Sequence, residues 1–213
     1  MKLGAVVVEN HFMSDLFACY NCKNQHEIGS LFCIKCNYIQ PITRNDYFAV
    51  LDIKAEFWLD LEELEFNYLK LQQLVHPDKF VTKSKPEQIL ALKHSVLLNN
   101  AYETLKDNLS RSEYLLAQNK LFVNQGEGNN INPDLELLEE IMDFRTILAD
   151  AEKLAEVKNL ADLNNENKQD TIDKIKKYFT LKNYENAARE TIKLRYLDKI
   201  TLDIELKLTM LTL

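Results

Sequence analysis

The 213-residue sequence predicts a mainly α-helical chain with a small cysteine-rich module, a helical hairpin and a carboxyl-terminal three-helix bundle. Three observations support this fold class. The chain has only 4 Gly and 4 Pro, whereas an all-β sandwich or barrel needs turn signals every ~8–12 residues. Apolar residues recur at the three- and four-residue spacing of one helix face. The hydrophobic content of 46% is high enough for a buried core.

The cysteine-rich module predicts a structural zinc site. All four cysteines follow the spacing Cys19-x2-Cys22-x10-Cys33-x2-Cys36. Each CxxC pair forms a tight turn, and tetrahedral Zn²⁺ binds four sulfur atoms at ~2.3 Å. The residue after each pair, Lys23 or Asn37, is where such turns often adopt a left-handed backbone. The alternatives are two disulfides, or a thiol oxidoreductase or metal-handling protein that uses the CxxC pairs.

Two amphipathic helices are expected in the middle of the chain. The first must end before Pro77, because proline disfavours the α conformation of the residue ahead of it; its apolar face comprises Leu61, Leu64, Tyr68, Leu71 and Val75. The second helix starts near Pro86, and the expected inner face comprises Ile89, Leu92, Val96, Ala101 and Leu105. His94, on the same helix, is expected to be a surface or hydrogen-bonded residue rather than a catalytic base.

The remaining helices lie towards the carboxyl end. Ser110, with Glu113 three residues later, predicts the capped start of a short helix. The polar run at 124–130 is typical of a linker. Three helices after Pro133 favour an antiparallel bundle, with the middle helix interrupted at Asn164–Asn167. The expected domains are a lead and four-cysteine zinc module at 1–41, a hairpin domain at 42–123, a linker at 124–132 and the bundle at 133–213.

The first helix of the bundle has two adjoining apolar stripes, which is more apolar surface than one neighbouring helix would cover. One stripe comprises Leu135, Leu138 and Met142, and the other comprises Leu137, Ile141, Phe144 and Leu148. For Leu138 and Met142, burial in the core and binding of a partner are equally good interpretations.

Charge and composition argue against several classes of protein. The net charge of −7 argues against a nucleic-acid binder, which usually has a basic surface. No apolar run approaches the ~20 residues of a membrane-spanning helix. A secretory signal and an Arg-rich presequence are both missing from the start, so we expect a cytoplasmic protein, with the mitochondrial matrix as the alternative. Because no Gly-rich phosphate loop or nucleophile elbow is present, we do not expect an enzyme.

The tripeptide His76-Pro77-Asp78 stands between the two middle helices. An ordinary helix-ending turn accounts for Pro77 and Asp78 but gives His76 no role. The order helix, His-Pro-Asp, basic loop and second helix resembles the J domain of DnaJ-type proteins. Further segments resemble the HscB family, over residues 46 to about 205: Asp46–Leu51, Leu71–Phe80, Leu98–Leu105, Leu109–Leu116 and Lys193–Lys199. The four cysteines resemble the variant of this family that adds a zinc module.

This resemblance implies a co-chaperone, which delivers an iron–sulfur scaffold protein of the IscU type to a dedicated DnaK/HscA-type chaperone and stimulates its ATP hydrolysis. The implied chaperone-binding residues are His76, Pro77, Asp78, Lys79 and Lys70. The implied scaffold-binding residues are Leu138, Met142, Asp143 and Tyr196. The family usually has a basic stripe on the helix before the tripeptide, but here Lys70 is the only base on that helix. Electrostatic steering is therefore weaker, or it moves to the lysines of the loop.

Overall fold

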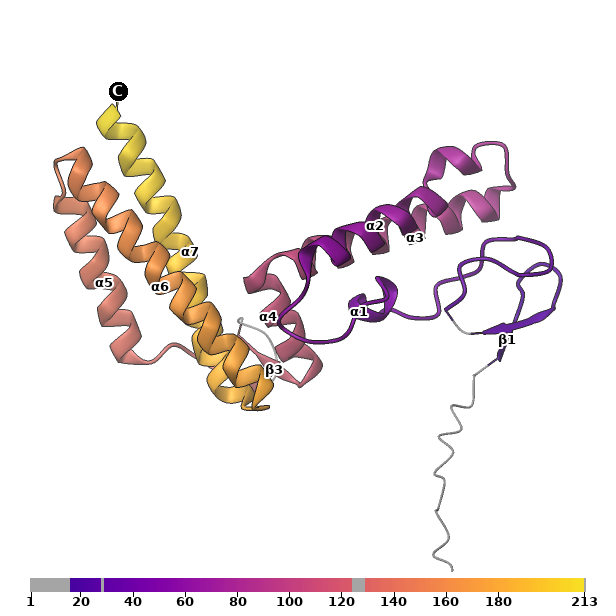
Figure 1. Ribbon diagram of the computed structural model, residues 1–213, viewed down its shortest axis with the longest axis horizontal. Coiled ribbons are helices and arrows are strands. Elements are labelled where there is room, and N and C mark those ends of the chain that lie inside the picture. Colours follow the sequence, from indigo (N-terminus) through magenta and orange to yellow (C-terminus); the bar gives the residue numbers. More distant parts are fainter. Residues whose placement is uncertain (1–15, 28, 124–128, 213) are drawn as a thin grey trace, which may run out of the picture. The chain divides into compact units, whose positions relative to one another are not determined.

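A computed structural model of the chain describes residues 16–27, 29–123 and 129–212, most of them in α-helices (Figure 1). The fold class predicted from the sequence is confirmed. The expected lead before residue 16, and residues 124–128 of the expected linker, lie outside the described residues. The chain forms two compact units. Of the described residues, one unit contains those up to Ile53 together with Glu65–Ala101, and the other contains Lys54–Leu64 and those from Tyr102 onward.

The first unit begins with the cysteine module. Strand β1 (Leu16–Ala18) pairs with antiparallel β2 (Gln25–Glu27), and a single bridge joins Phe32 to Ile39. The short helix α1 (Tyr47–Val50) follows, and its N-cap is Asp46, whose carboxylate accepts the Ala49 N–H at 2.9 Å. This cap satisfies one of the N–H groups that a helix start leaves without a partner.

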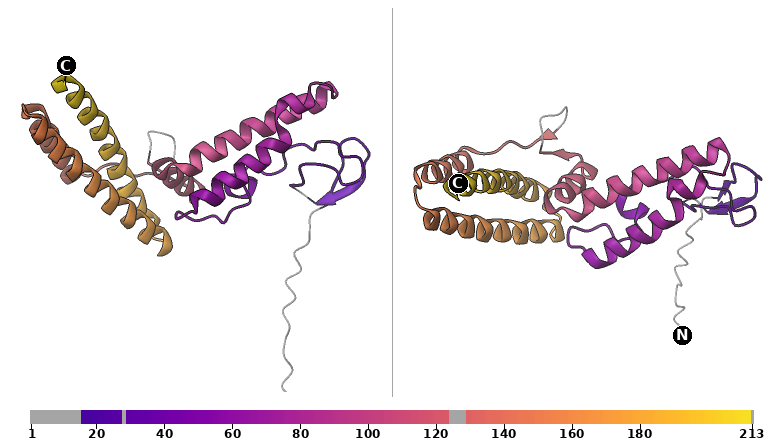
Figure 2. Two further views of the ribbon diagram at one scale, coloured as in Figure 1. Left: turned by 45° about the horizontal axis from the view of Figure 1, so that its top comes forward. Right: turned by 90° about the horizontal axis from the view of Figure 1, so that it is seen from above.

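Helices α2 (Leu61–Val75) and α3 (Lys85–Lys106) form the expected hairpin around the short 3-10 helix η1 (Pro77–Phe80), as Figures 1 and 2 show. The expected inner face of α3 is partly wrong, because Ile89, Leu92 and Val96 are about half exposed. The buried positions of this helix are Ala91, His94, Leu98, Ala101 and Leu105. The expected and the observed buried faces both follow helical spacing, and they share Ala101 and Leu105. The sequence pattern favours the expected face because, unlike the observed one, it contains no polar residue.

The second unit contains the carboxyl-terminal bundle. Helix α4 (Asn108–Gln118) is followed by β3 (Leu121–Phe122) and β4 (Asn129–Asn130), which pair in parallel. Helices α5 (Leu135–Asp150), α6 (Leu154–Thr180) and α7 (Tyr184–Thr212) then lie side by side (Figure 2). Asp107, rather than the expected Ser110, caps α4 by accepting the Ser110 N–H at 2.8 Å.

Ion pairs show how the bundle helices run. Lys193 lies 2.8 Å from Glu140, and Arg145 lies 2.9 Å from Asp203. Because residue numbers rise together along α5 and α7, these two helices are parallel. Helix α6, which connects them in sequence, runs in the opposite direction. Helix α6 is continuous, and the expected interruption is wrong. Asn164 of that stretch is buried, and its Nδ2 donates to the Leu197 carbonyl at 3.2 Å and to Thr201 Oγ1 at 2.9 Å.

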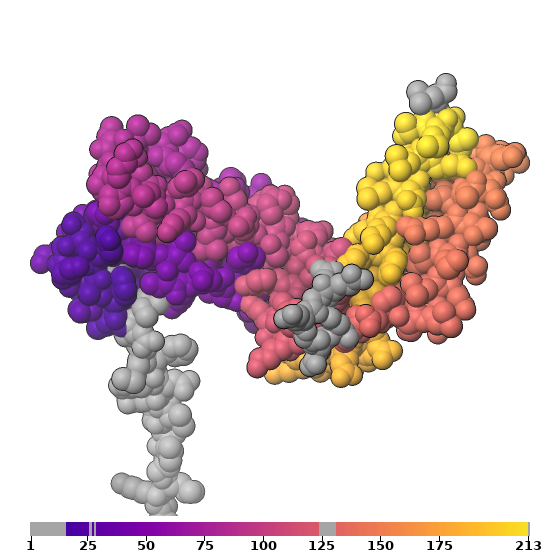
Figure 3. Space-filling model, turned by 180° about the vertical axis from the view of Figure 1, so that it is seen from behind, coloured from indigo at the N-terminus to yellow at the C-terminus, as the bar shows by residue number. Residues whose placement is uncertain are grey.

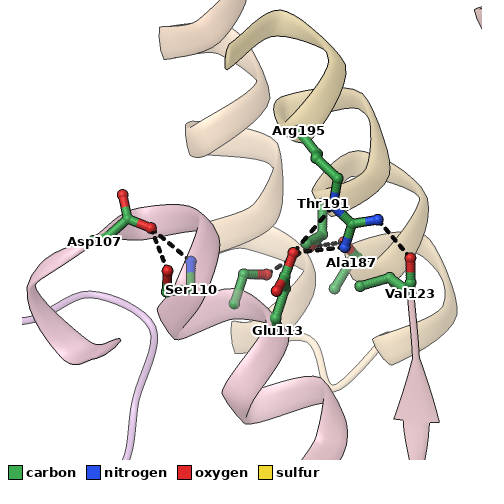
Figure 4. Close-up of polar contacts among 8 residues, drawn as sticks. Asp107, Ser110, Glu113, Val123, Ala187, Thr191 and Arg195 are labelled. Carbon is green, nitrogen blue, oxygen red and sulfur yellow. Dashed lines mark hydrogen bonds and ion pairs between the residues drawn. The ribbon is translucent and has the colours of Figure 1, made fainter. Parts of the chain in front are cut away.

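Two apolar clusters hold this unit together. The larger contains Ile141, Leu148, Ala151, Val157, Leu197, Ile200 and Ile204. The smaller joins α4 to the start of α7 and contains Leu116, Val123, Ala187, Ala188 and Ile192. Polar contacts also join α4 to α7, since Ser112 Oγ lies 2.5 Å from Thr191 Oγ1. Arg195 contacts both Glu113 and the Val123 carbonyl (Figure 4). No helix among the described residues combines the length and apolarity that a bilayer crossing needs.

Candidate functional site

The four cysteines converge on one point. Their Sγ atoms all lie within 4.8 Å of one another, and all four thiols are free. Cys19 Sγ is 3.6 Å from Cys36 Sγ, and Cys22 Sγ is 3.7 Å from Cys33 Sγ. A tetrahedron with metal–sulfur bonds of ~2.3 Å has edges of about 3.8 Å. The donor set and its spacing therefore fit a Zn²⁺ ion bound by four cysteines.

The backbone of the two CxxC turns is shaped for this geometry. Lys23 has φ 62° and Asn37 has φ 54°, which confirms the left-handed backbone expected after each pair. The Cys22 and Asn21 N–H groups donate to Cys19 Sγ at 3.4 Å. In the second turn, the Lys35 N–H donates to Cys33 Sγ at the same distance of 3.4 Å. Such N–H groups stabilise the negatively charged thiolate, which is the form of cysteine that binds metal.

The thiols differ in how readily they ionise. Burial acts to raise the pKa of Cys19, but the N–H groups of Cys22 and Asn21 outweigh it and lower that pKa to about 6. The Asn24 N–H acts to lower the pKa of Cys22, but burial and the neighbouring thiols raise it to about 11. One thiolate therefore forms near neutral pH, and the charge of a bound metal ion would favour ionisation of the others.

His76 lies in a rigid turn between α2 and α3. The Asp78 N–H donates to His76 Nδ1 at 3.3 Å, and the Asp78 carboxylate lies 3.6 Å from the same nitrogen. In the neutral ring the proton is then on Nε2, which can donate to a partner. The side chains of His76 and Asp78 are 55% and 86% exposed. Because Val75 and Phe80 are buried on either side, the turn presents its polar groups to solvent on a fixed base.

Polar contacts between the hairpin helices hold the turn in place. Tyr68 Oη donates to Asn99 Oδ1 at 3.0 Å, and Gln72 Nε2 donates to the Ser95 carbonyl at 3.2 Å. Near the start of α3, Gln88 Nε2 donates to the loop carbonyls of Val81 and Lys83. Lys70 on α2 and Lys79 in η1 are both exposed. The structure therefore places the five sequence-predicted residues on α2 or in the turn that ends it.

The second set of predicted residues lies at one level of the bundle. Met142 is 68% exposed, Asp143 is exposed, and Leu138 and Tyr196 are partly buried. Two ion pairs join α5 to α7 near this level, one from Glu140 to Lys193 and one from Arg145 to Asp203. Figure 3 shows α5 and α7 next to each other on one face of the unit. The inner stripe of α5 packs as expected into the core, which leaves the stripe with Met142 towards solvent.

Comparisons with known proteins match both the helical hairpin and the carboxyl-terminal bundle. The family model described as DnaJ domain matches residues 46–114, and the model described as HSCB C-terminal oligomerisation domain matches residues 133–205. The mouse iron–sulfur cluster co-chaperone protein HscB is 34% identical over 195 residues, which span 90% of this chain and 82% of the mouse protein. The chain belongs to the HscB family of co-chaperones. Within that family, the HscB homolog of Arabidopsis thaliana is 28% identical over 191 residues, or 89% of this chain and 74% of the plant protein.

Solved HscB structures share the fold. The crystal structure of human co-chaperone protein HscB matches with a TM-score of 0.80 at 34% identity, over 89% of this chain and 97% of the human chain. Chaperone HscB from Vibrio cholerae matches with a TM-score of 0.68 at 26% identity, over 78% of this chain and 98% of the bacterial chain. The resemblance to HscB proteins that the sequence motifs indicated is confirmed.

Gln40 lies against the four cysteines, although the sequence did not mark it as a candidate. Its side chain is 1% exposed, and Nε2 donates to Cys19 Sγ at 3.4 Å. Glutamine has no local signature as a neighbour of a metal ligand, and it lies 21 positions from the cysteine it contacts. The one available signal was a polar residue next to Pro41 at the end of the cysteine segment.

Proposed function

We propose that this co-chaperone delivers an iron–sulfur scaffold protein of the IscU type to a dedicated DnaK/HscA-type chaperone and stimulates that chaperone's ATP hydrolysis. The exposed His76 in its fixed turn is the observation that carries the proposal. The ring of His76 makes one local contact, with the Asp78 N–H that it caps, and is otherwise exposed, whereas Val75 and Phe80 beside it are buried. The contacts with Asp78 fix the orientation of the ring, which suits a binding surface.

The proposed mechanism is binding energy directed at one state of the chaperone. A rigid turn loses little conformational entropy when it docks, so more of its interaction energy is available to the complex. If the turn binds the hydrolysing conformation of the ATPase more tightly than the resting one, it shifts that equilibrium without taking part in the chemistry. Lys70 and Lys79, both exposed, supply positive charge that speeds encounter with an acidic surface.

The test is single-turnover ATP hydrolysis by the chaperone with the full chain added. His76→Gln is expected to abolish the stimulation, because it removes the ring from the turn. It should lower the melting temperature only slightly, because the side chain is exposed and gives up a single capping bond, to the Asp78 N–H. Gln73→Met on exposed α2 surface is the control for a substitution near the turn. Full stimulation by His76→Gln would contradict the proposal.

We also propose that Leu138, Met142, Asp143 and Tyr196 bind the scaffold protein. Met142→Ala is expected to weaken scaffold binding by roughly tenfold, the loss typical of one well-placed apolar contact at an interface. Met210→Ala is a matched control, since Met142 is 68% exposed and Met210 is 70% exposed on the same unit. Binding is measured by titration calorimetry with the purified scaffold. Equal affinities of the two variants would refute this assignment.

The four cysteines are proposed to hold a structural Zn²⁺. When bound, the ion supplies positive charge that keeps all four thiolates in one place, and the chain supplies the donors and the N–H groups around them. Metal analysis of the purified protein is expected to give one zinc per chain.

We propose a cytoplasmic location, with the mitochondrial matrix as the alternative. Subcellular fractionation of the source cells distinguishes the two.

A further inference from the structure

The seam between the cysteine module and the hairpin contains a buried polar connection that neither proposed binding surface uses. Gln40, at the end of the module, is 1% exposed, and His94, on α3, is 7% exposed. His94 Nε2 lies 2.8 Å from the Gln40 carbonyl oxygen. Since a carbonyl only accepts hydrogen bonds, the ring must carry its proton on Nε2 and donate. Both residues belong to the same compact unit.

The other end of Gln40 reaches the metal centre. Its Nε2 donates to Cys19 Sγ at 3.4 Å and to the Tyr38 carbonyl at 2.5 Å, while its Oε1 accepts the Tyr20 N–H at 3.0 Å. Its own N–H donates to the Leu31 carbonyl at 2.9 Å. Every polar group of this buried residue is therefore paired. A buried amide is costly unless its partners are in place, and those partners belong to the segments that hold the cysteines.

A cavity of about 350 Å³ lies beside His94, between the module, α1 and the hairpin helices; its lining includes Gly29, Arg44, Leu71 and Leu98. The hydrogen bond between His94 and the Gln40 carbonyl lies at the edge of this cavity. A bonded pair at the edge of a cavity fixes one geometry more sharply than loose apolar contact does.

We propose that Gln40 is a positioning residue for the metal ion and that its hydrogen bond with His94 couples metal binding to the stability of helix α3. The metal orders Cys19 and the turn around it, Cys19 orders the Gln40 side chain, and the Gln40 backbone then meets His94 in the correct place. By linkage, an ion that binds only the ordered module stabilises whatever unfolds together with it. Helix α3 is one of the two helices that hold the turn of His76 in place, so this coupling would extend the influence of the metal to the hairpin.

The first test measures zinc affinity of the full chain by competition with a chromophoric chelator. Gln40→Met keeps the length of the side chain and both backbone hydrogen bonds but removes the hydrogen bonds of the side-chain amide. It is expected to weaken Zn²⁺ binding by roughly 10- to 100-fold, as is typical of residues that support metal ligands. Gln73→Met, the same substitution on exposed surface of the same unit, is expected to leave the affinity unchanged. Unchanged zinc affinity in Gln40→Met would overturn the positioning role.

The second test measures hydrogen exchange of the α3 amides in zinc-loaded and chelator-treated protein. In the wild type, removal of zinc is expected to lower protection in the segment around His94 at least tenfold. In His94→Leu the donor is missing, so protection is expected to depend much less on zinc. His94→Gln offers an N–H at a similar position and is expected to restore the dependence, which also covers the case in which His94→Leu fails to fold. If protection of α3 in the wild type is the same with and without zinc, the coupling does not exist.

Discussion

Arg195 offers a quantitative test of how α4 is joined to α7. Its Nε and Nη2 lie 3.2 Å and 2.5 Å from Glu113 Oε1, and its Nη1 donates to the Val123 carbonyl at 2.6 Å. The three polar contacts are drawn in Figure 4. The side chains of Arg195 and Glu113 are only 21% and 28% exposed. The perturbation is Arg195→Met, which keeps the apolar stem of the side chain and removes its charge and its donors.

The expected cost has two parts. An exposed ion pair contributes about 0–1 kcal/mol to the free energy of unfolding, and a buried hydrogen bond to a charged group contributes about 1.5–3 kcal/mol. The Arg195–Glu113 pair is mostly shielded from solvent, so we take an intermediate contribution of about 1 kcal/mol. The Val123 carbonyl, in a residue 8% exposed, loses a donor at a cost of about 1 kcal/mol more. We therefore expect Arg195→Met to lower the free energy of unfolding by about 2 kcal/mol. In a double-mutant cycle with Glu113→Gln, the coupling energy should be about 1 kcal/mol.

The assay is urea unfolding followed by the fluorescence of Trp58. This is the only tryptophan of the chain, it lies in the same unit as Arg195, and its ring is 3.9 Å from Lys176 Nζ. The matched control is Arg145→Met, which breaks another arginine–carboxylate pair in the unit. Because Arg145 and Asp203 are 45% and 39% exposed, the control should cost less than about 1 kcal/mol. Equal losses for the two variants would refute the reasoning from burial.

Two further predictions concern the cores of the units. Ile175→Ala, at a fully buried position of α6, should lower the free energy of unfolding by about 2–4 kcal/mol, since it removes apolar contacts and leaves a cavity; a loss below about 1 kcal/mol in the Trp58 assay would contradict this. Burial lowers the pKa of His94, and the Gln40 carbonyl offsets part of that effect. The unfolded chain therefore takes up this proton first, so stability should fall as the pH drops below the unfolded pKa of about 6.5 and level off below the folded pKa. Melting temperatures between about pH 5 and pH 7 should show a smaller slope for His94→Gln than for wild type, and identical slopes would argue against the assignment.

The parts of the site that sequence could predict are those set by local chemistry. The spacing of the four cysteines requires two tight turns, and the left-handed backbone at Lys23 and Asn37 follows from those turns. Pro77 must end a helix, so an exposed turn at His76 could be anticipated. Each of these inferences depends on residues within a few positions of one another, where steric rules leave few alternatives.

The parts that sequence could not predict depend on distant partners. His94 can lie on the buried face of α3 because the Gln40 carbonyl, 54 positions away, accepts a hydrogen bond from its Nε2–H. The sequence pattern, which does not show that partner, favours Ile89, Leu92 and Val96 as the inner face. Asn164 suggested a break in α6 because asparagine disfavours helix interiors. Its amide instead donates to the Leu197 carbonyl on α7. In both cases a long-range hydrogen bond outweighs a local preference.

The division of the chain into units has a practical consequence for fragments. The short segment Lys54–Leu64 belongs with the carboxyl-terminal helices, although it precedes most of the hairpin in sequence. Phe57 in this segment is 3% exposed, and its ring stacks on Phe179 at a centroid distance of 5.5 Å. A truncated protein that ends where the DnaJ match ends, at residue 114, would bare this aromatic ring to water. Such a truncation would be expected to aggregate, unless a polar side chain replaced Phe57.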